Sequence, residues 1–290
     1  PITYSNTGKH LHDNGVYGSS TSNSISFANS FDWVRGSGIK PRGSCNVVIA
    51  NTISNAENGI SSTGNGAADS RGANGFGNIT AFNATDATRN FAITLDVQDG
   101  LYSRNAIVAF NSAKGHLGTT VNAPFRINTV EGYVAVGNTF DEHNADYGML
   151  MIAASDKAIN KSGVLALNVT ASSKPLARST YGQYGVHLGN LNSNGVGVQY
   201  RFQENTVVLG NNATSAALVD SPSYPCLGMT YVSNGGLATN VSSQATAVVD
   251  SNKSIINLID ATLLTPLPVR AGLIARDAAG ASYISTLIGS

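Results

Sequence analysis

The chain has 290 residues, with 17 basic and 17 acidic side chains and no net charge. It contains 31 Gly and 31 Asn, only 12 % of its residues are charged, and its 42 % hydrophobic residues lie in short runs. The composition excludes three classes: a basic nucleic-acid-binding protein, a disordered chain, and a protein inserted in a membrane, which needs an apolar run of ~20 residues.

An apolar segment that ends in Asn recurs along the chain. The clear copies are residues 25–30, 47–52, 79–84, 107–112, 134–139 and 164–169, and the weaker ones are residues 201–206 and 230–235. Their Asn-to-Asn spacings are 22, 32, 28, 27, 30, 37 and 29 residues. Such drift is typical of a constant coil that carries loops of varying length, whereas leucine-rich and ankyrin repeats keep a tighter period.

The recurring Asn is expected at a tight corner, because Asn tolerates the left-handed backbone conformation. Stacked from coil to coil, the Asn side chains would form a hydrogen-bonded ladder. The predicted ladder residues are Asn29, Asn51, Asn83, Asn111, Asn138, Asn168, Asn205 and Asn234.

A second strand is expected in several coils, at residues 58–62, 90–95, 146–151 and 183–188. Because side chains alternate between the two faces of a strand, each segment has a predicted inner and outer face. The outer face is predicted to carry Ala92, Thr94, Asp96, Gly148, Leu150, Gly185 and His187.

These patterns predict an all-β chain that forms a right-handed parallel β-helix with coils of about 22–37 residues over residues 1–255. A β-sandwich or jelly roll also has many short strands, but it gives no reason for the same Asn-ended strand to return. Residues 256–290, which include Pro266 and Pro268, break the pattern. They are predicted to be a C-terminal cap or a trimerisation segment.

The Asn-ended strands, followed by segments such as Asn58-Gly-Ile and Tyr184-Gly-Val, resemble the coils of the pectate-lyase-like superfamily. Within it, the Gly-, Asn- and Ser-rich coils, with few charges and no signal peptide at the start, are most similar to bacteriophage tailspikes. The resemblance covers roughly residues 15–255. It implies a homotrimer outside the cell or on a virion tail that binds and depolymerises surface polysaccharide.

Acidic residues are few, and several fall on three successive coils. Glycoside hydrolysis needs two carboxylates, ~5.5 Å apart in retaining enzymes and ~6.5–9.5 Å apart in inverting ones. Because coils stack at ~4.8 Å, carboxylates one or two coils apart satisfy either distance. The candidate catalytic residues are therefore Asp96, Asp99, Glu131, Asp141 and Glu142, although carboxylates beside corners more often are solvated or cap a turn.

The candidate substrate-binding residues are Arg126, Tyr147, Tyr181, His187 and Arg201. Arg126 is expected to face outward beside Asp96, where it would orient the substrate or keep its neighbour ionised. A lyase would instead need Lys, Arg, Tyr or His as a base beside a group that neutralises a uronate carboxylate. The candidates for these roles are Arg126, Arg178, Tyr181, His187 and Arg201.

No cofactor or metal is expected. Asp141, His143 and Asp146 lack the spacing of a calcium loop, and the sequence has no phosphate loop, zinc motif or nucleophile elbow. The leading hypothesis is a tailspike-like protein that hydrolyses a bacterial polysaccharide. The alternatives are a non-catalytic structural or adhesive β-solenoid and a polysaccharide lyase.

Overall fold

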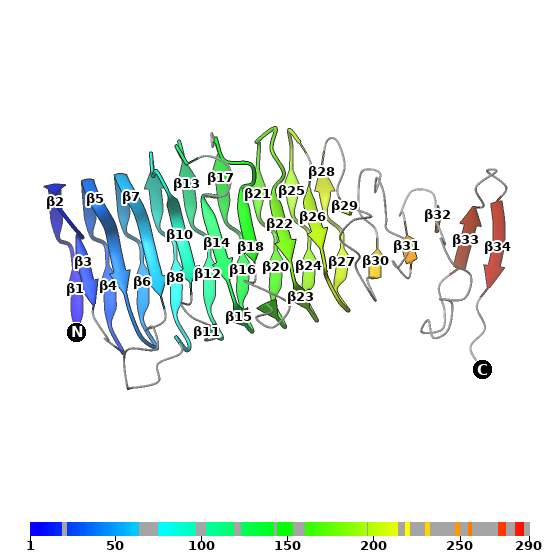
Figure 1. Ribbon diagram of the computed structural model, residues 1–290, viewed down its shortest axis with the longest axis horizontal. Helices are drawn as coiled ribbons and strands as arrows, with labels where there is room; N and C mark the ends of the chain where they lie inside the picture. The colour runs from blue at the N-terminus through cyan, green and yellow to red at the C-terminus, as the bar shows by residue number, and fades with distance from the viewer. Residues whose placement is uncertain are drawn as a thin grey trace.

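The computed structural model describes residues 1–18, 22–63, 75–96, 103–118, 123–141, 144–152, 160–195 and 197–213, and six short strands beyond them. Every helix or strand in these ranges is a β-strand. The strands stack coil upon coil along one axis, with the N-terminus at one end and the C-terminus at the other (Figure 1).

The longest stack is an 11-stranded parallel sheet, named sheet A here. It contributes one three-residue strand per coil, without register shifts. Its strands are β1 (Ile2–Tyr4), β4 (Ile25–Phe27), β6 (Val47–Ile49), β8 (Ile79–Ala81), β12 (Ile107–Ala109), β16 (Val134–Val136), β20 (Val164–Ala166), β24 (Val186–Leu188), β27 (Val207–Leu209), β30 (Thr230–Val232) and β31 (Ala247–Val249).

A second, 16-stranded sheet forks. At its N-terminal end, β2 (Thr7–Leu11) and β3 (Val16–Gly18) both pair with the long strand β5 (Ser30–Pro41), which pairs with β7 (Thr52–Thr63). The start of β7 pairs with β9 and its second half pairs with β10, so two branches leave it side by side (Figure 1).

Both branches are parallel. Branch B1 consists of β9 (Ala84–Asp86), β13 (Ser112–Lys114), β17 (Thr139–Asp141), β21 (Val169–Thr170), β25 (Leu191–Asn192) and β28 (Asn212–Ala213). Branch B2 consists of β10 (Phe91–Asp96), β14 (Phe125–Asn128), β18 (Met149–Ile152), β22 (Ala177–Thr180), β26 (Val198–Arg201) and β29 (Leu218–Asp220).

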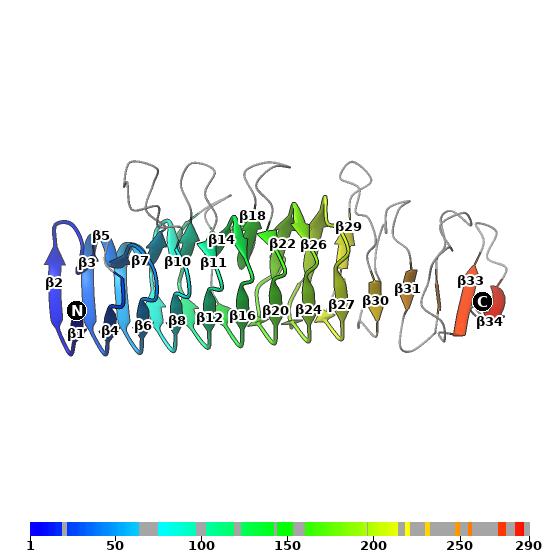
Figure 2. The same cartoon turned by 90° about the horizontal axis from the view of Figure 1, so that it is seen from below.

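A third sheet, sheet C, stacks β11 (Ser103–Arg104), β15 (Val130–Glu131), β19 (Asn160–Lys161) and β23 (Gly182–Gln183). A full coil therefore passes through sheet A, B1, B2 and C in turn (Figure 2). The chain is thus the right-handed parallel β-helix that the sequence predicted, but with four strands per coil where the sequence indicated two. The strands in B1 and C have only two or three residues, too few to show an alternating pattern.

The last sheet differs from the solenoid. Strand β32 (Ile255–Ile256) pairs in parallel with β33 (Gly272–Arg276), which pairs antiparallel with β34 (Ser282–Thr286). The division at residue 255 between a solenoid and a C-terminal segment stays a prediction.

Left-handed residues mark the corners on both sides of sheet A. Each strand follows one such residue and precedes another, and the two are five residues apart in every coil from Asn23 and Ala28 to Asn205 and Gly210. The sequence predicted that the recurring Asn adopts this conformation, which is wrong for the residues from Asn29 to Asn168 and correct for Asn205. The left-handed residue is the one before it, for example Phe82 before Asn83 and Phe110 before Asn111.

The predicted Asn ladder is present and continuous. In each coil the side-chain amide donates to the Asn oxygen of the next coil at 2.7–3.0 Å. Its members are Asn6, Asn29, Asn51, Asn83, Asn111, Asn138, Asn168, Asn190 and Asn211. The prediction was wrong for Asn205, which is an exposed corner residue. Asn234 lies outside the described residues, so its place in the ladder stays a prediction.

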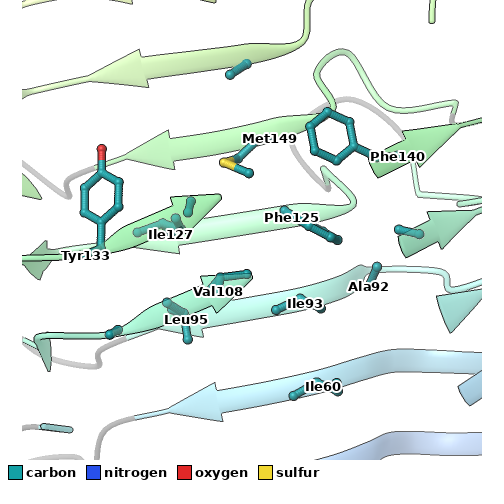
Figure 3. Packing of buried hydrophobic residues seen from close by; sticks show 14 of the residues in the cluster. Ile60, Ala92, Ile93, Leu95, Val108, Phe125, Ile127, Tyr133, Phe140 and Met149 are labelled. Atoms are coloured by element: carbon teal, nitrogen blue, oxygen red, sulfur yellow. The ribbon is translucent and has the colours of Figure 1, made fainter. Parts of the chain in front are cut away.

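The core is a column of apolar side chains enclosed by the sheets. Figure 3 shows Ile60 from β7, Ile93, Ile127 and Met149 from B2 strands and Val108 from sheet A pointing into it. Phe125 and Phe140 meet edge to face, with ring centres 5.3 Å apart, a geometry that aromatic pairs prefer. Burying each such large side chain contributes about 1.5–3 kcal/mol.

The segment 183–188 was misassigned. It contains the last residue of sheet C, the left-handed corner Tyr184 and the sheet A strand β24, and it is not the second strand of a coil. In sheet A the middle residue of each strand points inward, so His187 is buried while Val186 and Leu188 are exposed. Ala92, Gly148 and Gly185, predicted to be outward, are also buried.

Candidate functional site

The outer face of branch B2 carries a row of arginines. On β14 the half-buried Arg126 lies between the buried Phe125 and Ile127, and on β22 Arg178 lies likewise between buried neighbours. Arg126 pairs in register with Leu150, and Leu150 with Arg178, so the two arginines lie two strands apart, or about 10 Å at the strand spacing.

On the next strand, β26, the outward positions are Gln199 and Arg201, which pair with Arg178 and Thr180. The described outward positions of β14, β22 and β26 carry three arginines and no carboxylate, so these three strands present a positive face. The outward orientation that the sequence predicted for Arg126 is confirmed.

Aromatic rings hold two of these arginines. The guanidinium carbon of Arg126 lies 4.7 Å from the ring centre of Phe91. That of Arg178 lies 5.3 Å from the ring centre of Tyr147, and its Nη1 donates to the Tyr147 hydroxyl at 3.3 Å. A cation over an aromatic face is stabilised by the ring quadrupole, which fixes both planar groups across the face of B2. The sequence prediction that placed Tyr147 beside the substrate is consistent with this position.

Polar atoms without described partners lie beside the arginines. The Thr94 hydroxyl is buried next to Arg126, and the Thr180 hydroxyl is buried next to Arg201. Neither hydroxyl, nor Nε of Arg178, forms a hydrogen bond in the described part of the chain. A buried polar group without a partner costs about 1–3 kcal/mol, and a ligand could bond to these atoms only after neighbouring side chains move, because the atoms are not exposed.

A groove of about 390 Å³ opens near the N-terminal end, where β2, β5 and β7 turn toward B2. Trp33 lines it, half exposed and with its ring 6.0 Å from that of His10. Nη1 of Arg35 lies 3.3 Å from Nε2 of His12. The exposed Arg89 also lines the groove, and none of the lining residues is acidic. Aromatic and basic side chains therefore line the groove as well.

Glu131 lies elsewhere, on sheet C. Its carboxylate forms an ion pair with Arg104 at 3.1 Å, and it pairs in register with Lys161. Gln183 and Glu204 continue the row with a 2.7 Å hydrogen bond. Glu131 is thus one member of a ladder of alternating charges between coils.

Asp141 lies on the outer face of B1, opposite Lys114 in register, and accepts a hydrogen bond from the Ala171 amide at 3.3 Å. The strand β16 of sheet A separates it from Glu131 along the coil. The two carboxylates therefore do not form the predicted catalytic pair, because they face different sides of the solenoid.

Of the remaining carboxylates, Asp96 is the last residue of β10, where its backbone pairs with Thr63. Asp99 and Glu142 lie outside the described residues. Asp96 thus belongs to the same branch as the arginine row, close to its C-terminal edge.

His187 cannot bind a ligand on the surface. It is buried in the core and its Nδ1 lies 2.9 Å from the Tyr200 hydroxyl. Burial lowers its pKa from 6.5 to about 4, because the interior disfavours the charged form. The sequence prediction of an outward, substrate-binding His187 was wrong, since strand parity was counted from the wrong corner.

Tyr181 stacks on Phe202 of the next coil, with ring centres 4.8 Å apart, at a left-handed corner beside B2. Arg201 precedes this corner. These two predicted residues are therefore close to the arginine row.

Sequence reasoning missed Thr94 and Thr180 as site residues and considered Arg178 only for a lyase. These residues can be identified by their position in the strand. The outward-facing positions of the B2 strands, which begin at the same place in each coil, include Thr94, Arg126, Arg178 and Thr180.

In the described ranges, no group of three or more His, Cys, Asp or Glu side chains could hold a metal ion. No helix in the same ranges is long and apolar enough to cross a membrane.

No family model matches the sequence, and no curated protein is similar to it in sequence. Solved structures are similar in fold. The A-module of mannuronan C-5 epimerase AlgE6 from Azotobacter vinelandii aligns over 84 % of this chain and 78 % of its own, with a TM-score of 0.52 and 10 % identity. The AlgE4 A-module from the same organism aligns over 84 % and 80 %, with a TM-score of 0.43 and 10 % identity. At this identity the likeness to AlgE6 shows the parallel β-helix fold alone.

Proposed function

We propose that this chain binds an acidic polysaccharide along the outer face of branch B2. The observation that carries the proposal is the row of Arg126, Arg178 and Arg201, in which aromatic rings hold the first two.

An acidic glycan suits this face better than a neutral glycan or a nucleic acid. Arg binds carboxylates in a bidentate geometry and is favoured wherever planar anions are recognised. The few arginines of the face would neutralise only a few charges, and tight nucleic-acid binding needs more phosphate contacts from a strongly basic surface. The fold supports the proposal, because AlgE6 is named for its action on mannuronan.

Cleavage of the glycosidic bond is the second part of the proposal. Asp96 at the edge of B2, with Asp99 three residues later, and Glu142 after the end of β17 are the carboxylates that we assign to it. A homotrimer joined partly by residues 256–290, on a virion tail or a cell surface, is the setting that the tailspike resemblance implies. A non-catalytic adhesive solenoid and a polysaccharide lyase remain the alternatives that the experiments separate.

Binding is tested with the full chain and three probes: polygalacturonate, neutral dextran and double-stranded DNA. We expect binding to polygalacturonate alone. Arg178→Ala should weaken it at least about tenfold, because a hydrogen bond to a charged group contributes roughly 1.5–3 kcal/mol. Lys114→Ala, on the outer face of B1, is the matched control and should leave the affinity unchanged. Equal binding of dextran, or an unaffected Arg178→Ala variant, would contradict the proposal.

Cleavage is tested by the size of the products from any glycan that binds. Asp96→Asn should lower kcat at least about a hundredfold, the usual contribution of a general acid or base, while the affinity survives. Glu131→Gln and Asp141→Asn serve as comparison variants and should stay active, because both carboxylates belong to ladders outside B2. Unsaturated products would identify a lyase, and binding without any product would favour the adhesive solenoid.

A further inference from the structure

The outer face of sheet A is apolar from the first coil to the last one whose side chains are described. The first and third residues of each strand point outward, and none of them is charged. The outward residues are Ile2, Tyr4, Ile25, Phe27, Val47, Ile49, Ile79, Ala81, Ile107, Ala109, Val134, Val136, Val164, Ala166, Val186, Leu188, Val207 and Leu209.

Branch B1 provides an internal contrast. Most of its equivalent outward positions, one strand further along the same coils, carry polar or charged side chains such as Ser112, Lys114, Thr139 and Asp141, and Val169 and Leu191 are the large apolar ones among its described residues. The apolar character of sheet A is therefore not a general property of the strands in this solenoid.

The apolar surface also has a regular size pattern. The third residue of each strand and the left-handed corner residue after it form a pair, and in each pair one side chain is large and the other is small. The pairs are Tyr4-Ser5, Phe27-Ala28, Ile49-Ala50, Ala81-Phe82, Ala109-Phe110, Val136-Gly137, Ala166-Leu167, Leu188-Gly189 and Leu209-Gly210.

Placing the large side chain at the corner residue has a conformational cost. A bulky residue with positive φ is strained by about 1–3 kcal/mol, yet Phe82, Phe110 and Leu167 adopt it while 58 %, 53 % and 56 % exposed. They occur where the preceding strand residue is Ala. The rings of Phe82 and Phe110 stack with centres 5.2 Å apart.

Glycines at the corners also keep this apolar surface even in height. A Cβ atom on Gly137 would lie 2.5 Å from the Phe110 ring, and one on Gly189 would lie 2.9 Å from Leu167. Each large corner side chain thus fills the space above the next corner. A surface exposed to water has no reason to keep its height constant in this way, whereas a packed interface does.

We propose that the outer face of sheet A, with its corner row, is the interface through which copies of this chain associate side by side. Ala81, Ala109 and Ala166 are buried, but the other strand residues and the large corner residues Phe82, Phe110 and Leu167 expose roughly 50 Å² or more each, so nine coils present on the order of 1,000 Å², compared with about 800 Å² per partner in a stable interface. Exposed apolar patches on monomers rarely exceed a few hundred Å².

A second copy is the occupant because the surface is periodic. Its side chains repeat once per strand, at ~4.8 Å, along the whole stack of described coils. The partner must offer an equally long apolar face of the same pitch, which another copy of this solenoid has. Closed symmetric association then places like faces together. The inference does not depend on the proposed polysaccharide site, which lies on B2.

The first test compares two double variants of the full chain by sedimentation. Ile107→Lys with Val186→Lys introduces charge on sheet A. Ser112→Lys with Leu191→Lys introduces it on B1 in the same coils, and Leu191 is as exposed as Val186 (37 % and 39 %). We expect a multiple of 29.9 kDa for the native chain and the B1 variant, and 29.9 kDa for the sheet A variant. A native monomer, or equal dissociation of both variants, would overturn the inference.

The second test does not depend on tolerance of a lysine. Phe110→Gly removes a strained side chain, so the fold should keep its melting temperature, while association should weaken at least about tenfold, equivalent to ~1.4 kcal/mol. Adding Ala109→Phe moves the large side chain to the strand, as in Phe27-Ala28, and should restore association to within about threefold. Unchanged association of Phe110→Gly would exclude the corner row from the interface.

Discussion

At the scale of single residues, the Asn ladder holds the coils together. Asn111 illustrates its chemistry: its oxygen accepts from the backbone and the side chain of Asn83, and its amide donates to Asn138 and to the Thr80 carbonyl. A buried polar network is stabilising only when every member is satisfied. The ladder satisfies each Asn with identical neighbours, so it also fixes the register of the stacked coils.

We expect Asn111→Ala to lower the free energy of unfolding by about 3 kcal/mol or more, because several buried groups lose their partners at about 1–3 kcal/mol each. Asn6→Ala is the control, since the exposed Asn6 ends the ladder and only donates to Asn29. Urea denaturation should show a loss below about 1 kcal/mol for this variant. Equal losses would contradict a cooperative ladder.

The buried His187 gives the fold a pH dependence. Its folded pKa of about 4 lies below the ordinary 6.5, so the unfolded chain binds a proton more readily in the window between these values. The stability that a neutral His187 provides is complete above pH 6.5 and falls as the pH drops toward 4. Below pH 4 both states are protonated and the loss stops.

From pH 7 to pH 4 this residue alone should reduce the free energy of unfolding by about 3 kcal/mol. The variant His187→Leu with Tyr200→Phe removes the titrating group and its hydroxyl partner together. It should show a pH dependence that is smaller by that amount in urea denaturation at the two pH values. The same slope in the native and variant chains would show that other groups are responsible.

At the scale of the elements, sequence reasoning was reliable where strands recur in phase and failed where they are very short. The Asn-ended strands from Ile25 to Asn168 are confirmed, because the ladder imposes one residue type at one place. Asn205 was selected in place of Asn190 and Asn211, although only Arg-Phe-Gln-Glu precedes it. Val-His-Leu-Gly precedes Asn190 and Val-Val-Leu-Gly precedes Asn211, as Val-Ala-Val-Gly precedes Asn138, so this part of the ladder was visible in the sequence.

The corners that begin the strands of sheet A set limits on side-chain size. A Cβ on Gly163 would lie 2.0 Å from the buried Tyr133 ring, whereas one on Gly185, at the same place in the next coil, would approach no atom closer than 3.3 Å. Gly163→Ala should therefore cost about 1–3 kcal/mol by overpacking. Gly185→Ala should cost less than about 1 kcal/mol, and thermal melts of both variants check the difference.

At the scale of the whole molecule, the candidate site was predictable only in part. Arg126, Tyr147 and Arg201 were selected from the sequence, and the structure brings Arg126 and Arg201 to one face. The carboxylate pair was not predictable, because Glu131 and Asp141 belong to different sides of the coil. To assign a residue to one side of the solenoid, all four corners of its coil must be located. Strands of two or three residues are too short to show where these corners lie.

The stacked architecture predicts how the molecule opens. Each coil contacts only its neighbours, so stability is approximately a sum along one axis and the ends open first. In hydrogen exchange we expect the amides of β12, β16 and β20 to be protected at least about tenfold more than those of β1. Equal exchange rates along sheet A would indicate a single global unfolding unit.

The constant distance between corners has a consequence for how the sequences of such chains evolve. From the corner before sheet A to the one after B1 the chain takes ten residues, as from Asn23 through Ala28 to Trp33 and from Cys45 through Ala50 to Asn55. The remainder of the coil takes 12 residues from Trp33 to Cys45, 22 from Asn55 to Gly77 and 18 from Ala87 to Asn105. The length of these coils therefore varies on one flank of the solenoid and stays constant on the flank that holds sheet A. Under the proposed function, a lineage of such chains can acquire new glycan specificities by exchanging single loops, while every descendant keeps the surface that we assign to self-association.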